Sequence, residues 1–248
     1  MARATGSFVL TASTDEDHQR MGRLVDEFSG RGVDGLLLAP PPGDQARLAA
    51  HLRRGMPLVL VDRPAEGIDV PAVLSDNAGG MRAAVRHLAR HGHRRIAYLG
   101  DLRSTPMRQR YEGFLAGLAE HGLAPEPEAV RHDTENEAEA IAAVARLLAG
   151  PEPPTAIIAA RNTLSFGAVR ALRRAGAHHR VALLGFDDID LADELDPGLT
   201  VVAQDPREIG GVAAGILLDL LADPAARATG RLLPTRLIPR GSAEIRPA

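Results

Sequence analysis

Residues 180–205 read RVALLGFDDIDLADELDPGLTVVAQD, and the pattern of this stretch decides the fold class. Residues 181–185 are apolar or small with no polar alternation, which is typical of a strand covered on both faces. Phe186 follows, and the run then ends in two adjacent acids, Asp187 and Asp188. Such carboxylates at the end of a buried strand either cap the next helix or bind a ligand. The rest of the chain is needed to choose between these two roles.

Short apolar runs of this kind alternate with amphipathic stretches along the whole chain. The runs predict strands at residues 7–12, 34–39, 57–62, 94–100, near 130, 155–160, 180–186, 199–204 and 235–239. The amphipathic stretches predict helices at residues 15–31, 44–54, 77–91, 106–121, 135–149, 163–175 and 206–221. Alternation of buried strands with helices predicts an α/β fold with parallel sheets.

Glycines support the predicted helix ends, and three segments between elements suggest how the chain is divided. Gly follows a predicted helix, where a residue with positive φ is favoured, at Gly32, Gly55, Gly92, Gly122 and Gly176. The segments 62–77, 193–206 and 228–234 look like crossings between two α/β lobes. The predicted lobes are residues 1–75 plus 205–232 and residues 76–204 plus 233–248.

Composition excludes several classes of protein. The 248 residues contain no Cys, so disulfides, thiolate metal sites and cysteine catalysis are excluded. No apolar run approaches the ~20 residues of a membrane span, and the N-terminus does not resemble a signal peptide. A net charge of −3 gives the chain as a whole no electrostatic footprint for nucleic acid. We expect a cytoplasmic protein that does not contact a membrane.

No catalytic, metal or cofactor motif is found. G-x-G-x-x-G, the P-loop, H-E-x-x-H and G-x-S-x-G are all missing from the sequence. His87 and His91 have a spacing that could serve a metal, but no third ligand lies nearby at a recognised spacing. We therefore expect neither an enzyme nor a metal or cofactor site.

Polar side chains recur where predicted strands end. Asp62 and Arg63 follow one strand, Arg161 and Asn162 follow another, and Asp187 follows a third. Ligands of open α/β sheets bind outside the carboxyl ends of the strands. Each residue alone is more often a helix cap or a turn former. Their recurrence at several strand ends weakens that explanation without identifying a ligand.

Residues 75–100, SDNAGGMRAAVRHLARHGHRRIAYLG, closely resemble the signature of the lactose/galactose-repressor (LacI/GalR-type) family of transcriptional regulators. Members typically show D-N-x-x-G followed by H-L-x-x-x-G-H-R-R-I-A. Four further segments match in the family's order, so that the resemblance extends over residues 7–244: GRGVDGLLLAP, RQRYEGFLAGLAEHGL, VALLGFDDIDLADELDPGLTVVAQDPREIG and LIPRGSA.

The resemblance implies a type I periplasmic-binding-protein-like fold, with two lobes joined by three crossings and an effector in the cleft. Asp187 matches a carboxylate that hydrogen-bonds effector hydroxyls, Arg110 matches the arginine that contacts the effector, and Asp62 matches an acid of the N-terminal lobe. Further effector-binding positions are Arg63, Ala39, Phe186, Ser75, Arg161 and Asn162. The implied partners are a small-molecule effector of carbohydrate type, a second copy in a homodimer, and operator DNA bound through a separate headpiece.

Two features depart from the family pattern. Arg161-Asn162 stands where Asn-Asp is usual, which favours an acid-bearing ligand unless Arg161 points outward. The helix-turn-helix headpiece and the first strand and helix of the N-terminal lobe have no counterpart. A misassigned start, a deliberately shortened protein or a natural fragment completed by another chain would each explain this.

The expected function is the effector-binding and dimerisation core of such a regulator. A solute-binding protein of a sugar transporter, which has the same fold, is the alternative. An upstream helix-turn-helix would favour the regulator, and a signal peptide would favour the transporter receptor.

Overall fold

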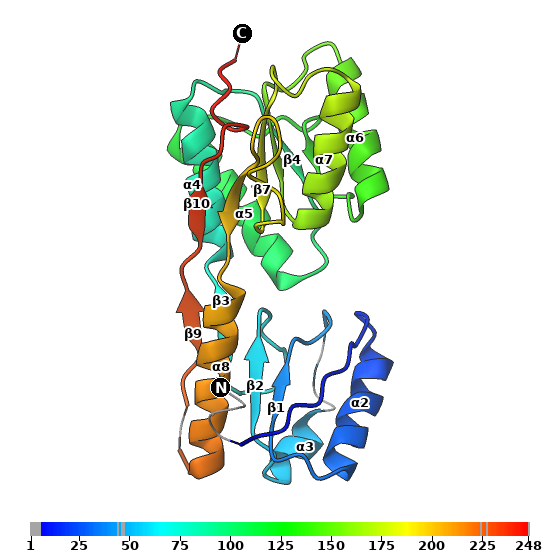
Figure 1. Cartoon of the computed structure of the whole chain (residues 1–248), viewed down its shortest axis with the longest axis vertical. Coiled ribbons are helices and arrows are strands. Elements are labelled where there is room, and N and C mark those ends of the chain that lie inside the picture. Colours follow the sequence, from blue (N-terminus) through cyan, green and yellow to red (C-terminus); the bar gives the residue numbers. More distant parts are fainter. Residues whose placement is uncertain (1–5, 44, 46–47, 224, 227, 248) are drawn as a thin grey trace. The chain divides into compact units, whose positions relative to one another are not determined.

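The computed structural model describes residues 6–43, 45, 48–223, 225–226 and 228–247, and Figure 1 labels most of its elements. The chain forms two compact units. Unit 1 contains Met1–Ser75 and Asp205–Leu233, and unit 2 contains Asp76–Gln204 and Pro234–Ala248. The chain therefore passes between the units three times. Leu233, which the sequence assigned to the second lobe, lies in unit 1.

Unit 1 is built on a four-stranded parallel sheet with the order β1-β2-β3-β9. Its strands are β1 (Leu36–Leu38), β2 (Leu58–Val61), β3 (Ala72–Ser75) and β9 (Arg231–Leu233), and its helices are α2 (His18–Gly30), α3 (Ala49–Arg53) and α8 (Pro206–Ala222). Alternate side chains of the strands enter two separate cores. Leu36 and Leu58 pack in the core that contains α2 residues, whereas Val59 and Val73 pack with Ala213 of α8.

Unit 2 is built on a six-stranded sheet with the order β10-β8-β7-β6-β4-β5. Its strands are β4 (Ile96–Leu99), β5 (Val130–Arg131), β6 (Ala156–Ala159), β7 (Ala182–Phe186), β8 (Thr200–Ala203) and β10 (Arg236–Ile238). Its helices are α4 (Asn77–Arg90), α5 (Thr105–Glu120), α6 (Glu137–Ala149) and α7 (Asn162–Arg174). Every residue of β4, β6, β7 and β8 is buried, as the apolar runs predicted.

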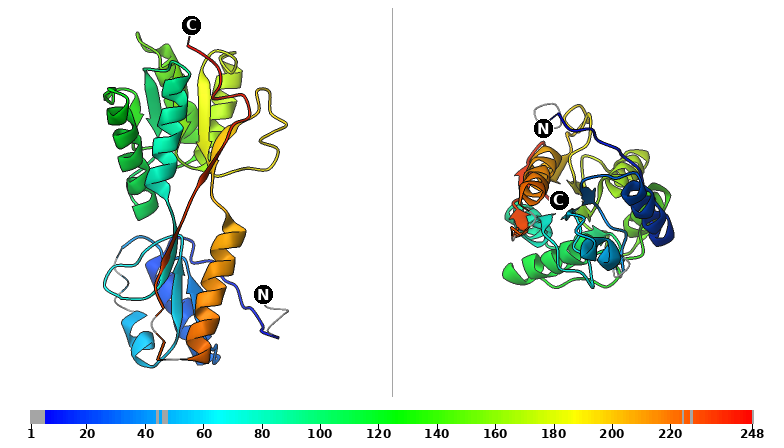
Figure 2. Two further views of the ribbon diagram at one scale, coloured as in Figure 1. Left: turned by 90° about the vertical axis from the view of Figure 1, so that its left-hand side faces the viewer. Right: turned by 90° about the horizontal axis from the view of Figure 1, so that it is seen from below.

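Helices cover both faces of the sheet in unit 2. Met81 of α4 and Phe114 of α5 belong to the core on one face, and Val144 of α6 and Leu172 of α7 belong to the core on the other. Figure 2 shows the two helix pairs from two further directions. This two-sided burial is the physical reason for the strands without polar alternation, and it confirms the α/β fold class.

The structure corrects the sequence prediction at several elements. Residues 7–12 form no strand, and Phe8 is fully exposed; within the described part of the chain β1 pairs with β2, and no strand pairs with this segment. Strand β10 pairs antiparallel with β8, an exception to the predicted parallel sheet. Strands β3 and β9 lie in segments interpreted as crossings, and β9 is held by pairing with β3 although two of its three residues are exposed.

Helix boundaries agree more closely with the prediction. Positive φ angles occur at all five glycines that follow predicted helices: Gly32, Gly55, Gly92, Gly122 and Gly176. The helix predicted over residues 44–54 is shorter, since α3 begins at Ala49; Asp44, Ala46 and Arg47 lie outside the described residues.

Candidate functional site

The polar side chains of unit 2 meet at one edge of its sheet. Strands β4, β6 and β7 are parallel neighbours, so their carboxyl ends lie at the same edge. Asp101, Arg161 and Asp187 follow these three strands at or close to their last residues. Helix α5 brings Arg110 to the same place, where its side chain lies 3.8 Å from the Asp187 carboxylate. We call these four residues the unit 2 cluster.

Arg110 is a buried cation whose guanidinium is held by several contacts. Its side chain is only 5% exposed. Nε donates to Asn77 Oδ1 at 2.9 Å, and Nη1 donates to the carbonyl oxygen of Ala160 at 2.7 Å. The guanidinium carbon lies 3.6 Å from the centroid of the Phe186 ring, a cation–π contact. These contacts fix the guanidinium beside Asp187.

Asp187 and Asp188, the two acids at the end of β7, make different contacts. Asp187 has a φ of +71°, and its Oδ1 accepts a 2.6 Å hydrogen bond from Gln204 Nε2. Its side chain remains 25% exposed, so a ligand can reach it. Asp188 instead forms a bidentate pair with Arg240 at 2.8 and 2.7 Å. The hydrogen bonds from Arg240 lower the pKa of Asp188, whose role is structural.

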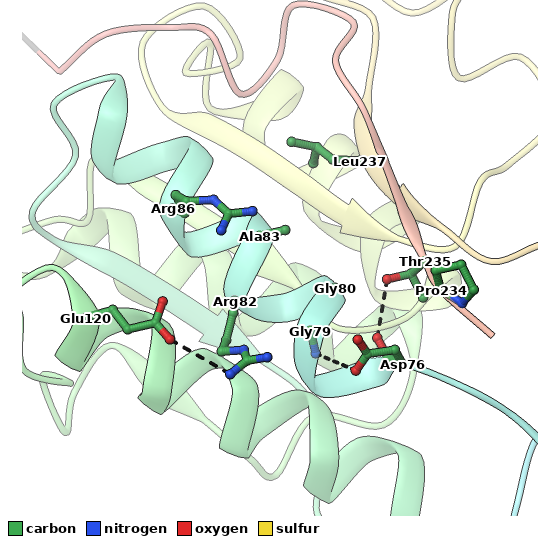
Figure 3. A pocket seen from close by; sticks show the side chains of 10 residues that line it. All are labelled: Asp76, Gly79, Gly80, Arg82, Ala83, Arg86, Glu120, Pro234, Thr235 and Leu237. Atoms are coloured by element: carbon green, nitrogen blue, oxygen red, sulfur yellow. Dashed lines mark hydrogen bonds and ion pairs between the residues drawn. The ribbon is translucent and has the colours of Figure 1, made fainter. Parts of the chain in front are cut away.

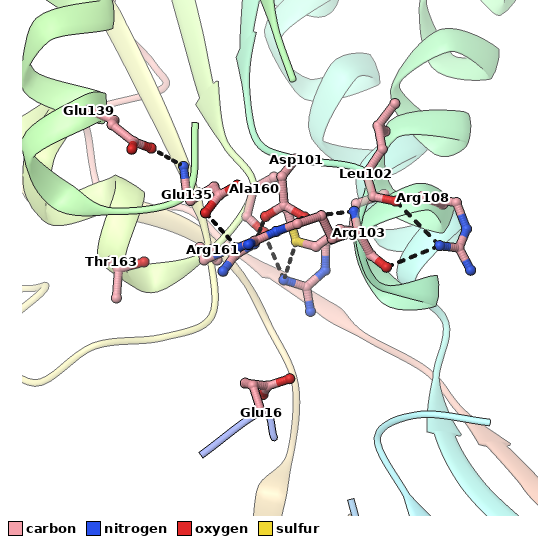
Figure 4. Close-up of polar contacts among 12 residues, drawn as sticks. Glu16, Asp101, Leu102, Arg103, Arg108, Glu135, Glu139, Ala160, Arg161 and Thr163 are labelled. Carbon is pink, nitrogen blue, oxygen red and sulfur yellow. Dashed lines mark hydrogen bonds and ion pairs between the residues drawn. The ribbon is translucent and has the colours of Figure 1, made fainter. Parts of the chain in front are cut away.

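Arg161 is paired with a buried acid, Asp101, whose side chain is 3% exposed (Figure 4). Oδ1 of Asp101 also accepts a 2.9 Å hydrogen bond from the Arg103 backbone, and the Arg103 guanidinium lies 2.8 Å from Glu135. The positive charge of Arg161 is therefore balanced within the unit. Asn162, the first residue of α7, is exposed, and its Oδ1 accepts a hydrogen bond from the backbone N–H of Thr163.

A second group of polar residues lies in unit 1, around the end of β2 and the turn before α2. Arg63 Nη1 is 2.5 Å from Glu16 Oε2 and 3.4 Å from the carbonyl oxygen of Pro40, while Arg63 Nε is 3.6 Å from Asp62. Asp62 and Glu16 both have positive φ, +65° and +59°. We call Glu16, Asp62 and Arg63 the unit 1 cluster.

The two strand-end acids share an uncommon backbone conformation. Asp62 follows β2 and Asp187 lies at the end of β7, and both have φ in the left-handed region. Asp tolerates this region better than most residues, and non-glycine residues held there are concentrated at functional sites. The same geometry in both units supports ligand binding by these two acids.

The other predicted residues take less prominent positions. Ser75 is buried at the end of β3, and Ala39 is exposed just after β1. Several polar residues of these networks were not predicted, among them Glu16, Asn77, Asp101 and Gln204. Asp101 follows the run IAYLG, so the strand-end rule could have found it, and Asn77 lies in the D-N motif. Nothing in the local sequence indicates the contact of Glu16 with Arg63, which are 47 residues apart.

Metal binding and membrane insertion find no support in the residues that the structure describes. No group of three or more His, Cys, Asp or Glu side chains among them is placed to hold a metal ion. None of the helices in the described ranges has the length and apolar character needed to cross a bilayer.

The fold and the strand-end clusters define a class of protein. Residues 85–243 match the family model of the periplasmic binding protein-like domain. The structure of a LacI-family regulatory protein from Chloroflexus aggregans is similar, with a TM-score of 0.86 and 28% identity over 97% of this chain and 88% of that one. A LacI-family regulator from Enterococcus faecalis, solved with bound ribose, has a TM-score of 0.84 and 25% identity over 98% of this chain and 89% of that one.

Proteins that are clearly similar in sequence are named as transcriptional regulators or repressors. The repressor CytR of Escherichia coli is 30% identical over 98% of this chain and 72% of its own length. The ribose operon repressor of the same organism is 31% identical over 96% of this chain and 73% of its own length. An HTH-type regulator of Streptomyces limosus is 34% identical over 88% of this chain, which spans just under two thirds (65%) of that relative. The chain belongs to the LacI/GalR-type family of transcriptional regulators, and these relatives favour a regulator over a transporter receptor.

Proposed function

We propose that this chain is an effector-binding core that recognises a small polyhydroxylated ligand, a carbohydrate or a close relative of one. The observation that carries the proposal is the pairing of Asp187 with Arg110 at the strand-end edge of unit 2. Asp187 offers carboxylate oxygens that accept hydrogen bonds from hydroxyl groups, and Arg110 offers fixed donors. Phe186 is fully buried, and its ring contact with the guanidinium helps to hold Arg110 in place.

The charge balance of the unit 2 cluster supports a neutral ligand over an acid. Arg110 is near Asp187, and Arg161 is paired with the buried Asp101, so each cation has an acid beside it. An acidic ligand would have to compete with Asp101 for Arg161. The named ligands of relatives point the same way, since ribose is bound in the Enterococcus faecalis structure. In unit 1, Asp62 and Arg63, with Ala39 and Ser75, are further candidates for effector contacts.

We also propose a wider function by analogy with the family. The chain forms a homodimer in the cytoplasm, has no catalytic activity, and affects transcription through an HTH headpiece of the kind for which its relatives are named. The net charge of −3 gives these 248 residues no general attraction for DNA. A gel shift with a palindromic operator at physiological salt should show no tight binding, and gel filtration with light scattering should give twice the chain mass.

A thermal melt against a ligand panel tests the effector proposal directly. The panel contains monosaccharides, disaccharides, polyols, nucleosides and sugar acids. A ligand at 100 times its dissociation constant should stabilise the folded protein by about 2.7 kcal/mol. We expect a neutral sugar, polyol or nucleoside to raise the transition temperature. A shift produced only by sugar acids would contradict the charge argument.

Matched variants connect that shift to the site. Asp187→Asn should abolish it, whereas Asp190→Asn, an exposed acid three residues further along, should leave it unchanged. If both variants retain the shift, the ligand binds elsewhere in the molecule.

A further inference from the structure

Unit 2 contains a second candidate binding site, away from the strand-end cluster. A cavity of about 340 Å³ lies between α4, the C-terminal end of α5 and the segment that leads into β10 (Figure 3). Arg82 and Arg86 of α4, Glu120 of α5, Asp76, Pro234 and Thr235 line it. Its volume is within the range of small-ligand pockets, about 300–1,000 Å³. None of the residues assigned to the effector lines this cavity.

The charged groups of the cavity leave one cation without a partner. Asp76 is engaged by its own helix, since its Oδ1 accepts a 2.8 Å hydrogen bond from the backbone N–H of Gly79. Arg82 and Glu120 face each other at 3.9 Å and offset one another. Arg86 has no ion pair or hydrogen bond with any residue that the structure describes. The two arginines and the two acids of the lining balance in formal charge, so Arg86 is the cation whose N–H donors remain available to a ligand.

Arg82 and Arg86 are suited to hold one anionic group together. They are four residues apart on α4, so their side chains lie on the same face of the helix. Guanidinium groups bind phosphate oxygens through paired N–H donors. The carboxylates of Glu120 and Asp76 and the hydroxyl of Thr235 can bond to hydroxyl groups beside that anion. A ligand with one phosphate and several hydroxyls satisfies both sets.

We propose that this cavity is a regulatory site for a small phosphorylated polyol or sugar, with Arg86 and Arg82 holding the phosphate. The lining acids select against an anion without hydroxyl groups. The sugar portion lies toward Asp76 and Thr235.

The cavity lies beside two of the three chain crossings, which gives a bound ligand a route to the effector. The chain leaves unit 1 between Ser75 and Asp76, and it returns to unit 2 between Leu233 and Pro234. Thr235 Oγ1 donates to the carbonyl oxygen of Asp76 at 3.3 Å, so the two crossing segments are bonded together at the pocket wall. The close packing of Thr235 against α4 depends on Gly80, where a Cβ atom would lie 2.8 Å from Val202 and closer still to Thr235.

A ligand that contacts Asp76 and Thr235 therefore acts on two connections between the units. We expect it to change effector affinity, and the effector should change its affinity by the same factor. This coupling rests on the proposed effector function, whereas binding in the cavity does not.

Isothermal titration calorimetry of the 248-residue chain tests the site. The probes are glucose 6-phosphate, inorganic phosphate and glucose, each at the same ionic strength set with sodium chloride. We expect glucose 6-phosphate to bind at one site per chain and more tightly than phosphate, with no comparable binding of glucose. Arg86→Gln should weaken that binding about tenfold or more, because a charge-assisted contact is lost. Arg90→Gln, an exposed arginine one turn further along α4 and outside the cavity, should not.

Other outcomes would overturn the proposal. Equal affinity in the Arg86→Gln variant and the unmodified chain would place the anion elsewhere. Equal affinity for phosphate and glucose 6-phosphate would exclude a sugar or polyol phosphate. Protection of Arg86 from phenylglyoxal by glucose 6-phosphate, measured by mass spectrometry, tests the same contact without a variant; unprotected Arg86 would contradict it.

The coupling is measured separately, as the effector affinity with and without saturating glucose 6-phosphate. A change of about fivefold or more is expected for coupled sites. Failure to find any effector would affect only this measurement, and an unchanged effector affinity would remove the regulatory part of the proposal.

Discussion

Gly113→Ala is expected to destabilise unit 2, although alanine is the better helix former. Gly113 lies within α5, where α5 packs on α4. A Cβ atom at this position would lie 2.8 Å from the Cα of Ala78 and closer still to its carbonyl oxygen. These are backbone atoms of α4, which cannot rotate away as a side chain would. The two helices must therefore separate to accept the methyl group.

The expected size follows from two opposing effects. Replacing glycine by alanine within a helix stabilises it by about 1 kcal/mol. Overpacking a close contact costs about 1–3 kcal/mol, and the upper part of that range applies where the backbone must move. The net loss is then about 1–2 kcal/mol. For a unit of this size each kcal/mol lowers the melting temperature by about 2–4 °C, so we expect a decrease of about 2–8 °C.

Tyrosine fluorescence during urea unfolding is a suitable assay, because the chain has two Tyr and no Trp. Tyr98 and Tyr111 both lie in unit 2, with ring centroids 5.3 Å apart, so the signal reports on unit 2 alone. Ala116→Gly, at an exposed position of the same helix, is the control for helix propensity and should cost about 1 kcal/mol. If Gly113→Ala has an unchanged or higher urea midpoint while the control loses stability, the reasoning about close helix packing is wrong.

Three further predictions concern a buried histidine, the central arginine and the N-terminal segment. Burial lowers the pKa of His93 below its ordinary value of 6.5, so in acid the unfolded chain binds more protons than the folded chain. The contribution of His93 to the free energy of unfolding should therefore be complete above about pH 6.5 and decrease as the pH falls below it. His93→Gln should flatten the stability profile between pH 7 and 5, and an unchanged slope would show that other groups cause the loss. Arg110→Met should cost about 2–4 kcal/mol, because the buried oxygen of Ala160 loses a charged donor, and should abolish the effector-induced shift. Urea unfolding measures the loss of stability. Arg108→Met, on the exposed side of α5, should change neither the stability nor the effector-induced shift. Phe8→Ser should change stability by less than about 0.5 kcal/mol, since this side chain is fully exposed; a loss above about 1 kcal/mol in a thermal melt would mean that residues 7–12 pack against the protein.

Much of the fold could be predicted because its signals are local. A strand buried on both faces must be apolar at every position, which identifies β4, β6, β7 and β8 from their composition. A helix that ends in a left-handed residue favours glycine, and all five predicted positions have positive φ. The strand-end rule brought Asp187 and Arg161 into one group for the same reason, since parallel neighbours end at one edge of a sheet.

Strand prediction failed where pairing decides the outcome. Residues 7–12 have the apolar composition of a strand but pair with no strand that the structure describes, whereas β9, two thirds exposed, is a strand because β3 lies beside it. Backbone hydrogen bonds between strands join residues far apart in sequence, so a local pattern gives no information about whether a partner exists.

The sequence by itself determined the α/β class, the family and the positions where polar residues follow buried strands. Only the tertiary structure decided which charges are paired. In the folded chain Arg161 pairs with the buried Asp101, Asp188 pairs with Arg240, and Arg110 lies near Asp187. Each of these pairs joins residues at least 50 positions apart. The energy of such a pair depends on distance and burial, which are properties of the folded chain and not of its local sequence.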